Sequence, residues 1–260
     1  MQIIPLTANT AARLERLFPE HPPIAIRLWA ILDGVIQGRL LVDEPDCPRR
    51  AFIVDVTENH VYLGGALNAL LIQQAFTILG ACQPLVVCLW PGDPLLSMLP
   101  GEQDYAGVAI DFSERSPQVD LNRLAVIPAG YELRQIDAAY ARAVPEFDYY
   151  VKMFGSLQGA VEHMIGYYLA QGEKIACEAV AAPLARDVAE IGVETQPGFQ
   201  QKGLASALCA YVIRKCEAQG YRTFWNASEQ NTASVALARK LGLRREQRMT
   251  VLAWPAMEAT

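Results

Sequence analysis

The sequence has little histidine, no paired cysteines and no block of basic residues. Its three histidines, His21, His60 and His163, lie far apart and do not have the spacing of metal ligands. None of the six cysteines belongs to a Cys-x-x-Cys pair, which favours buried thiols in a reducing compartment. The net charge of −6 and the missing basic block argue against a nucleic-acid-binding surface. We therefore expect no metal, no nucleic-acid partner and a cytoplasmic location.

We expect no secretory signal, because no basic region followed by an apolar core occurs at the N-terminus. A long uncharged run extends from Val61 to Gly92, but polar residues, Gly80 and Pro84 interrupt it. Hydrophobic residues form 52% of the chain and charged residues 19%, which is typical of a globular protein with a large core. The uncharged run therefore predicts a buried helix and strand, and we expect no membrane partner.

The first half of the chain carries no phosphate-binding glycine loop and no catalytic triad spacing. Helices and strands alternate there, and one predicted helix runs from Ile26 to Gln37 and is ended by Gly38. The polar segment Ser113–Asn122 contains Pro117 and is the expected linker. We predict an α/β domain over residues 1–118 and a second domain over residues 119–260. The first domain could form half of a substrate pocket or serve as a structural partner.

The second half predicts an α+β fold with a mixed, mostly antiparallel sheet. A strand near Gly130–Ile136 and short helices precede three consecutive antiparallel strands, and a helix, a strand, a helix and a last strand follow. This order is not that of a doubly wound sheet. A dinucleotide-binding fold also requires a Gly-x-Gly-x-x-Gly turn and a ribose-binding carboxylate, and both are missing.

The stretch from Glu190 to Leu243 contains the strongest functional signal. Ile191, Val193 and Thr195 alternate as in a strand with one buried face. Pro197 and Gly198 break that strand, and a loop leads through Gly203 into a helix with apolar residues at helical spacing. A turn that opens a helix directs free backbone N–H groups and the positive end of the helix dipole at one place. The sequence therefore predicts a phosphate or pyrophosphate site here.

Two spaced motifs in this stretch resemble a known family. Gln200-x-x-Gly203-x-Ala205 matches the R/Q-x-x-G-x-G/A signature of the GNAT superfamily of acyl-CoA-dependent N-acyltransferases. Asn231-x-x-Ser234-x-x-Leu237-x-x-Lys240-Leu241-Gly242-Leu243 is similar to a second signature of that family. The residues in and around both motifs resemble the zwittermicin-resistance-type subgroup of this family still more closely. The resemblance covers about Gly130 to Trp254, and the N-terminal half could be a degenerate copy of the same fold.

The resemblance implies acetyl-CoA as co-substrate and a set of binding residues. Backbone groups at the end of the strand would contact the pantetheine arm, and the loop and first helical turn would hold the pyrophosphate. Asn231 would contact the pantetheine or order the end of the next strand, and Ser234 and Lys240 would lie near the tail of CoA. The implied cofactor-binding residues are Val193, Thr195, Gln200, Gln201, Lys202, Gly203, Leu204, Ala205, Ser206, Asn231, Ser234 and Lys240.

Acyl transfer to an amine also needs a base, because amines are protonated near neutral pH. Glu190 and Glu194 are four residues apart on the strand and so face the same side of it, where either could be the catalytic base or a solvated strand residue. Asn226 and Trp225 could line the substrate pocket, although Trp225 could equally be a core residue.

One position departs from the family pattern. Ala238 stands where the family commonly has a general-acid tyrosine, so that water, Cys177, Tyr211, Tyr221, Ser228 or the helix dipole would have to replace it. We predict an N-acetyltransferase that moves an acetyl group from acetyl-CoA to a primary amine of a small molecule in a ternary complex. A catalytically silent acyl-CoA-binding or sensing module, or an interaction protein on the same scaffold, are the alternatives.

Overall fold

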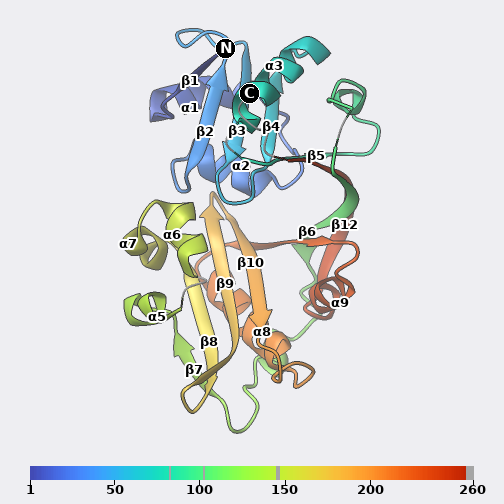
Figure 1. The fold of residues 1–260 in the computed structure, drawn as a ribbon. Coiled ribbons are helices and arrows are strands. Elements are labelled where there is room, and N and C mark those ends of the chain that lie inside the picture. Colours follow the sequence, from blue (N-terminus) through green and yellow to red (C-terminus); the bar gives the residue numbers. More distant parts are fainter. Residues whose placement is uncertain (82, 102, 145–146, 256–260) are drawn as a thin grey trace. The chain divides into compact units, whose positions relative to one another are not determined.

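The structure is a computed structural model that describes residues 1–81, 83–101, 103–144 and 147–255. The chain forms two compact units (Figure 1). The first contains Met1–Ala109 and the segment that begins at Arg248, and the second contains Ile110–Gln247. The boundaries fall within β6 (Tyr105–Arg115) and β12 (Leu243–Trp254). The division into two folding domains after residue 118 stays a prediction.

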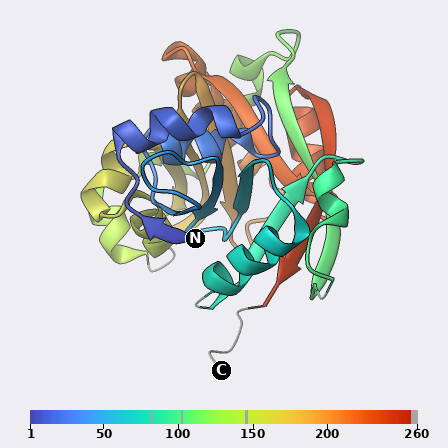
Figure 2. The same cartoon turned by 90° about the horizontal axis from the view of Figure 1, so that it is seen from above.

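The first unit is built on an antiparallel sheet with the order β1-β2-β3-β4. A further strand, β5, pairs antiparallel with the last residues of β12, from Thr250 to Trp254. Figure 2 shows the teal helix α3 lying beside the red strand β12. The elements of this unit are β1 (Gln2–Ile4), α1 (Ala8–Leu14), η1 (Glu15–Leu17), α2 (Ala25–Leu32), β2 (Gly38–Val42), β3 (Arg50–Asp55), β4 (Val61–Gly65), α3 (Ala69–Gly80), β5 (Leu85–Leu89) and η2 (Pro94–Ser97).

The described part of the uncharged run from Val61 to Gly92 forms β4, α3 and β5, and one face of α3 and most apolar side chains of the two strands lie in the core of the first unit, whereas Leu70 and Ile78 are exposed. Ile72 and Leu79 of α3 are fully buried against this core. No helix among the residues that the structure describes is both long and apolar enough to span a membrane. The prediction of a buried helix and strand is therefore confirmed.

The predicted helix from Ile26 to Gln37 is shorter than expected. It ends at Leu32, and the chain turns back through Gly34, whose φ of +73° is left-handed. The N–H groups of Val35 and Ile36 both donate to the carbonyl of Ala30, which closes the turn. Gly38 does not end the helix but begins β2.

His60, in the connection between β3 and β4, is predicted to make the stability of the first unit depend on pH. Its Nδ1 atom is buried without a hydrogen-bond partner. Burial, together with the charge of Arg27, lowers the pKa of His60 to about 4 from 6.5. The unfolded chain then binds more protons than the folded chain between these values, so stability falls as the pH falls from about 6.5 to about 4.

We expect this loss to reach at most about 3 kcal/mol, because each pKa unit corresponds to about 1.4 kcal/mol. Urea unfolding of the protein and of His60→Leu across this pH range measures it as the difference between the two slopes. His21→Leu, at a side chain that is 84% exposed, is the control. Equal slopes for the protein and His60→Leu would contradict the prediction.

The second unit contains a sheet with the order β12-β6-β11-β10-β9-β8-β7. The strands from β7 to β10 pair antiparallel, and β10 pairs parallel with β11. This confirms the predicted α+β fold with a mixed, mostly antiparallel sheet flanked by helices. The remaining elements are α4 (Leu121–Leu124), β7 (Glu132–Gln135), α5 (Ala138–Ala143), α6 (Asp148–Phe154), α7 (Leu157–Glu162), β8 (Ile165–Gln171), β9 (Lys174–Ala185), β10 (Val188–Thr195), α8 (Leu204–Ala218), β11 (Arg222–Ser228) and α9 (Thr232–Lys240).

The expected linker Ser113–Asn122 is structured. Strand β6 continues through Arg115, and α4 begins at Leu121. Between them the Ser116 N–H donates to the carbonyl of Gly242 at 2.7 Å, and its hydroxyl accepts from Arg244 at 2.6 Å. The polar side chains of this segment therefore make hydrogen bonds within the second unit, which is why their composition resembled that of a linker.

Helices cover both faces of this sheet. The buried face of β10, which includes Ala189 and Ile191, belongs to one core with α8. On the other face the hydroxyl of Tyr150 in α6 lies 4.0 Å from where a Cβ on Gly192 would stand. Figure 1 shows α5, α6 and α7 beside β7 and β8. One face of β10 therefore packs against α8, and the opposite face lies towards α6.

Candidate functional site

The ladder between β10 and β11 ends part-way along both strands. The parallel pairs run from Val188 opposite Arg222 to Glu190 opposite Phe224. On its other edge β10 stays paired with β9 as far as Thr195 opposite Cys177. Beyond Glu190, therefore, one edge of β10 offers backbone N–H and C=O groups that no strand of the described ladder uses.

The loop after β10 leads into α8 through residues with left-handed backbone. Gln201 has a φ of 60°, and Gly203 has a φ of +79° at the N-cap of α8. No side chain caps this helix, so the first N–H groups of α8 remain available for an anion. The described atoms leave open space where a Cβ on Gly203 would stand. Glycine is therefore favoured at position 203 by the left-handed backbone conformation, and not by the close approach of another protein group.

A cavity of about 660 Å³ lies between the end of β10, the first turn of α8 and helix α9. Lys240 is the charged side chain among its described lining residues. The cavity brings together all of the predicted cofactor-binding residues except Lys202, whose ammonium lies 5.1 Å from the centre of the Phe199 ring. The lining is made of Val193, Thr195, Phe199, Gln200, Gln201, Gly203, Leu204, Ala205, Ser206, Asn231, Ala233, Ser234, Ala236, Leu237 and Lys240.

Sequence reasoning missed Phe199, Ala233, Ala236 and Leu237 as lining residues. In the sequence, positions 233, 236, 237 and 240 have the spacing of one helix face, and this pattern could have identified the α9 side of the cavity. The short side chains of the alanines on that face leave room for a ligand beside the helix. Phe199 has no comparable signal, because it lies in an irregular loop.

Residues of the second motif line the cavity and also make hydrogen bonds that stabilise α9 and its contact with β11. Asn231 caps α9, where its side chain accepts from the Ser234 N–H at 3.1 Å. The Ser234 hydroxyl in turn accepts from the indole N–H of Trp225 at 3.0 Å. Trp225 is 2% exposed and belongs to the core beside α8. Its neighbour Asn226 donates to Asp111 of β6 at 2.7 Å. Neither Trp225 nor Asn226 lines the cavity.

The two predicted bases lie on the face of β10 that is turned away from α8. Ala189 and Ile191 are buried in the α8 core, so Glu190, Gly192 and Glu194 alternate onto the opposite face. Glu190 is half-buried at the last pair before β11 diverges, and Glu194 is exposed near the strand end. Their common face, expected from the sequence, agrees with this alternation.

The comparisons with known proteins decide the family. A sequence model described as GNAT acetyltransferase matches residues 20–252. The chain belongs to the GNAT acetyltransferase family. The enzyme named [Ribosomal protein bS18]-alanine N-acetyltransferase of Escherichia coli K12 is 30% identical over 117 residues, which span 45% of this chain and 73% of that protein. This GNAT protein is thus an acyltransferase, as predicted.

Two solved structures share the fold over nearly the whole chain. A GCN5-related N-acetyltransferase-like protein from Streptococcus suis has a TM-score of 0.69 at 20% identity, covering 94% of this chain and 99% of that one. A tandem GNAT protein from the clavulanic acid biosynthesis pathway has a TM-score of 0.63 at 15% identity, covering 100% and 99%. The match to a tandem GNAT protein fits the two-part description of this chain.

The position of the usual general-acid tyrosine is buried in this GNAT protein. Ala238 is 0% exposed in the core, whereas its neighbour Leu237 reaches the cavity. Of the alternative acids, Cys177 contacts a residue of the cavity lining, since its sulfur accepts from the Thr195 hydroxyl at 3.3 Å. Burial raises the pKa of Cys177 to about 11, so its thiol is protonated at neutral pH. Tyr211 lies on α8 with its ring 5.0 Å from that of Tyr167.

Replacing Gly203 with glutamate should weaken acetyl-CoA binding by about 100-fold or more. A side chain at this left-handed residue strains the backbone by about 1–2 kcal/mol, and a carboxylate would compete with phosphate for the first N–H groups of α8. Isothermal titration calorimetry with acetyl-CoA measures the change. Gly220→Glu is the matched control, because Gly220 also has a positive φ of +88° in open space but follows the other end of α8. Unchanged affinity in Gly203→Glu would contradict the phosphate-site assignment.

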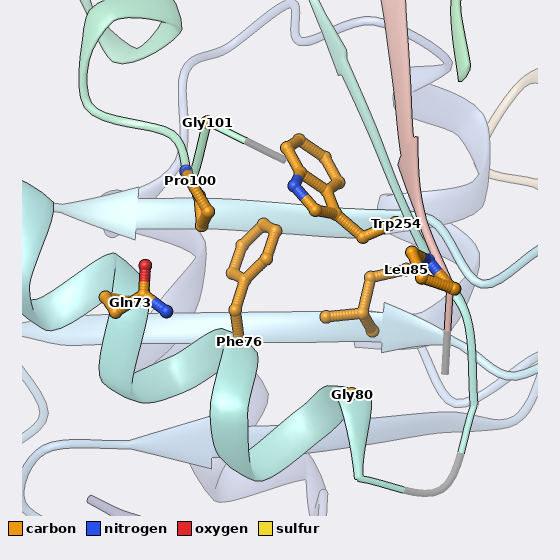
Figure 3. A pocket seen from close by; sticks show the side chains of 8 residues that line it. Gln73, Phe76, Gly80, Leu85, Pro100, Gly101 and Trp254 are labelled. Atoms are coloured by element: carbon orange, nitrogen blue, oxygen red, sulfur yellow. The ribbon is translucent and has the colours of Figure 1, made fainter. Parts of the chain in front are cut away.

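A second cavity, of about 360 Å³, lies in the first unit between α3, the start of β5 and the end of β12 (Figure 3). The rings of Phe76 and Trp254 meet edge-on there, with centroids 4.9 Å apart, and the Trp254 indole nitrogen is buried without a hydrogen-bond partner. Its described lining contains no titratable side chain, so it offers no acid or base. Among the residues that the structure describes, no cluster suits a metal ion in either unit.

Proposed function

We propose that the protein transfers an acetyl group from acetyl-CoA to a primary amine of a small molecule, by direct attack in a ternary complex. The observation that carries this proposal is one cavity with the uncapped start of α8 at one end and the diverging strand β10 at the other. The first feature suits a pyrophosphate and the second an extended amide-containing arm. The residues of the two motifs support membership of the zwittermicin-resistance-type subgroup of the family.

On this proposal the chain supplies positioning and charge. The N–H groups of Leu204, Ala205 and Ser206 and the ammonium of Lys240 hold the pyrophosphate. Backbone groups between Val193 and Thr195 bind the pantetheine arm and orient the thioester carbonyl. Lys202 contributes a nearby positive charge from outside the cavity lining. The diphosphate and the arm would thus approach from the α8 side of the sheet.

Two protons leave the nitrogen and one is taken up by the sulfur. Glu194 or Glu190 takes the first proton from the protonated amine, directly or through water, and the lone pair of the neutral amine then attacks the thioester carbonyl carbon. When the tetrahedral intermediate collapses, the C–S bond breaks, the thiolate leaves with the bonding electrons, and the nitrogen loses its second proton to water as the amide forms. With Ala238 buried, water protonates the thiolate, and Asn226 helps to shape the acceptor side, whereas Trp225 lies in the core beside α8 and is not part of the acceptor pocket.

Thiol release from acetyl-CoA, measured over a panel of amines, tests the proposal. The panel includes diamines, amino acids, aminoglycosides and a peptide with an N-terminal alanine, because the E. coli relative is named for alanine acetylation of a ribosomal protein. Release that depends on a small amine supports the proposal, and release with the peptide alone overturns the small-molecule part. Tight acetyl-CoA binding without release for any amine favours the alternative, a silent acyl-CoA-binding or sensing module.

We also propose a cytoplasmic location. Acetyl-CoA is a cytoplasmic metabolite in the setting that the resemblance implies. The free thiols of Cys47, Cys177, Cys209 and Cys216 are consistent with a reducing compartment.

A further inference from the structure

Glu178 of β9 was not among the residues singled out from the sequence, and the sheet register brings it to the acceptor side of the site. It lies directly opposite Glu194 in the antiparallel pair β9–β10. Opposite residues have Cβ atoms about 4.5–5.5 Å apart, and like charges in this arrangement destabilise a sheet. Among the described residues no ion pair involves Glu194. The protein therefore holds two carboxylates side by side on the face where the base is proposed to act.

A buried tyrosine fixes one of these carboxylates. Tyr140 of α5 is 6% exposed, and its hydroxyl donates to Oε2 of Glu178. Burial, followed by the bond to Glu178, raises the pKa of Tyr140, so its hydroxyl remains a donor at all ordinary pH values. Glu178 is thus restrained by a neighbour, whereas Glu194 is exposed at the end of its strand. The two carboxylates are chemically similar but differently held.

Aromatic rings flank the restrained carboxylate. Tyr168 lies opposite Glu178 on the next strand, β8, and its ring centre is 4.4 Å from that of Tyr140. Arg134 of β7 lies opposite Tyr168 and binds Glu132 at 2.6 Å. Tyrosine rings beside a carboxylate are a favourable surface for an organic ammonium group. The rings beside Glu178 therefore favour the binding of an organic ammonium group.

The neighbouring glycine leaves space for such a ligand. Gly192 lies on the same face of β10, two residues before Glu194, and is exposed. A Cβ there would meet the Tyr150 hydroxyl only at 4.0 Å, which is ordinary contact distance. The missing side chain keeps the strand accessible between Glu190 and Glu194.

We propose that Glu178, positioned by Tyr140, is a specificity-determining residue that binds a second positive charge of the acceptor while Glu194 accepts the proton from the reacting amine. This inference rests on the proposed function and names its acceptor class, a short diamine. One amine loses its proton to Glu194 before attack, and the other remains an ammonium paired with Glu178. After transfer the product is a monoacetylated diamine that keeps one positive charge.

Steady-state kinetics with propanediamine and propylamine as the acceptors test this proposal. The wild-type protein should have a KM for the diamine about 10- to 100-fold below that for the monoamine, which is the range expected of one charge-assisted hydrogen bond. Glu178→Gln should raise the KM for the diamine towards that for the monoamine with little change in kcat. Tyr140→Phe should act in the same direction but less, because the carboxylate remains.

Glu173→Gln, in the exposed turn between β8 and β9, is the matched control for the loss of one negative charge and should keep the diamine preference. The acetyl-CoA dissociation constant reports whether each variant is folded. A diamine preference retained by a folded Glu178→Gln, or a preference for the monoamine in the wild type, overturns this inference and leaves the proposed function standing. Acetylation of no amine by the wild type overturns the proposed function itself.

Discussion

Replacing Glu194 with glutamine should lower kcat for amine acetylation by about 10²- to 10⁴-fold, which is the usual contribution of a general base. Glutamine has nearly the same shape and stays uncharged, so it cannot take the proton that the amine must lose before attack. The acetyl-CoA dissociation constant should not change, because the side chain of Glu194 points away from the α8 face of β10. The rate effect thus separates chemistry from cofactor binding.

The comparison with Glu190→Gln decides between the two predicted bases. Glu190 lies at the last pair of the β10–β11 ladder and is half-buried, whereas Glu194 lies exposed beyond the divergence. We expect the larger loss in Glu194→Gln, since the free edge of β10 is where the thioester is proposed to lie. The measurement is kcat and kcat/KM against pH for both variants. A larger loss in Glu190→Gln would assign the base to Glu190, and full rates in both variants across pH would show that neither is the base.

Replacing Asp55 with alanine should destabilise the protein by about 3–5 kcal/mol, because it leaves a buried guanidinium without its partner. Asp55 and Arg27 form an ion pair of 2.8 Å in which the side chains are 0% and 6% exposed. Asp55 also accepts from the hydroxyl and the N–H of Thr57. Glu58 remains 3.9 Å from Arg27, but it is 39% exposed and compensates only in part.

The acid side of the stability curve provides a second measure of this pair. Burial by itself would raise the pKa of Asp55, but the charge of Arg27 and the bonds from Thr57 outweigh it and lower the pKa overall. The stability from a lowered carboxylate pKa is present above the unfolded value and is lost as the pH falls through the folded value. The free energy of unfolding of the wild type should therefore lose this contribution below about pH 4, whereas that of Asp55→Ala should not contain it at any pH.

Urea unfolding at neutral pH gives the size of the effect, and Asp187→Ala is the matched control. Asp187 pairs with Arg222 at 2.7 Å, but both side chains are 61% exposed, so that loss should be about 1 kcal/mol or less. Similar losses for the two variants would contradict the view that burial makes the Arg27–Asp55 pair important.

The local elements of this protein could be predicted because their signals lie within a few residues. Ser156 and Asn231 cap the helices that follow them, and the alternation of Ile191, Val193 and Thr195 matches the faces of β10. The cofactor-binding residues that the family resemblance implies stay a prediction, and all of them except Lys202 line one cavity. The length of α2 was wrong because the turn at Gly34 depends on bonds back to Ala30, which periodicity does not report.

The sequence by itself determined the strand–loop–helix after Glu190, the second motif on α9 and, through both, the family. These follow from backbone conformation, capping and helical spacing, which nearby residues decide. Only the tertiary structure decided where β10 leaves β11, that position 238 faces the core, and that Glu178 stands opposite Glu194 with Tyr140 bonded to it. Strand register and side-chain packing join residues far apart in the chain, and a one-residue change of register would turn Glu178 to the other face.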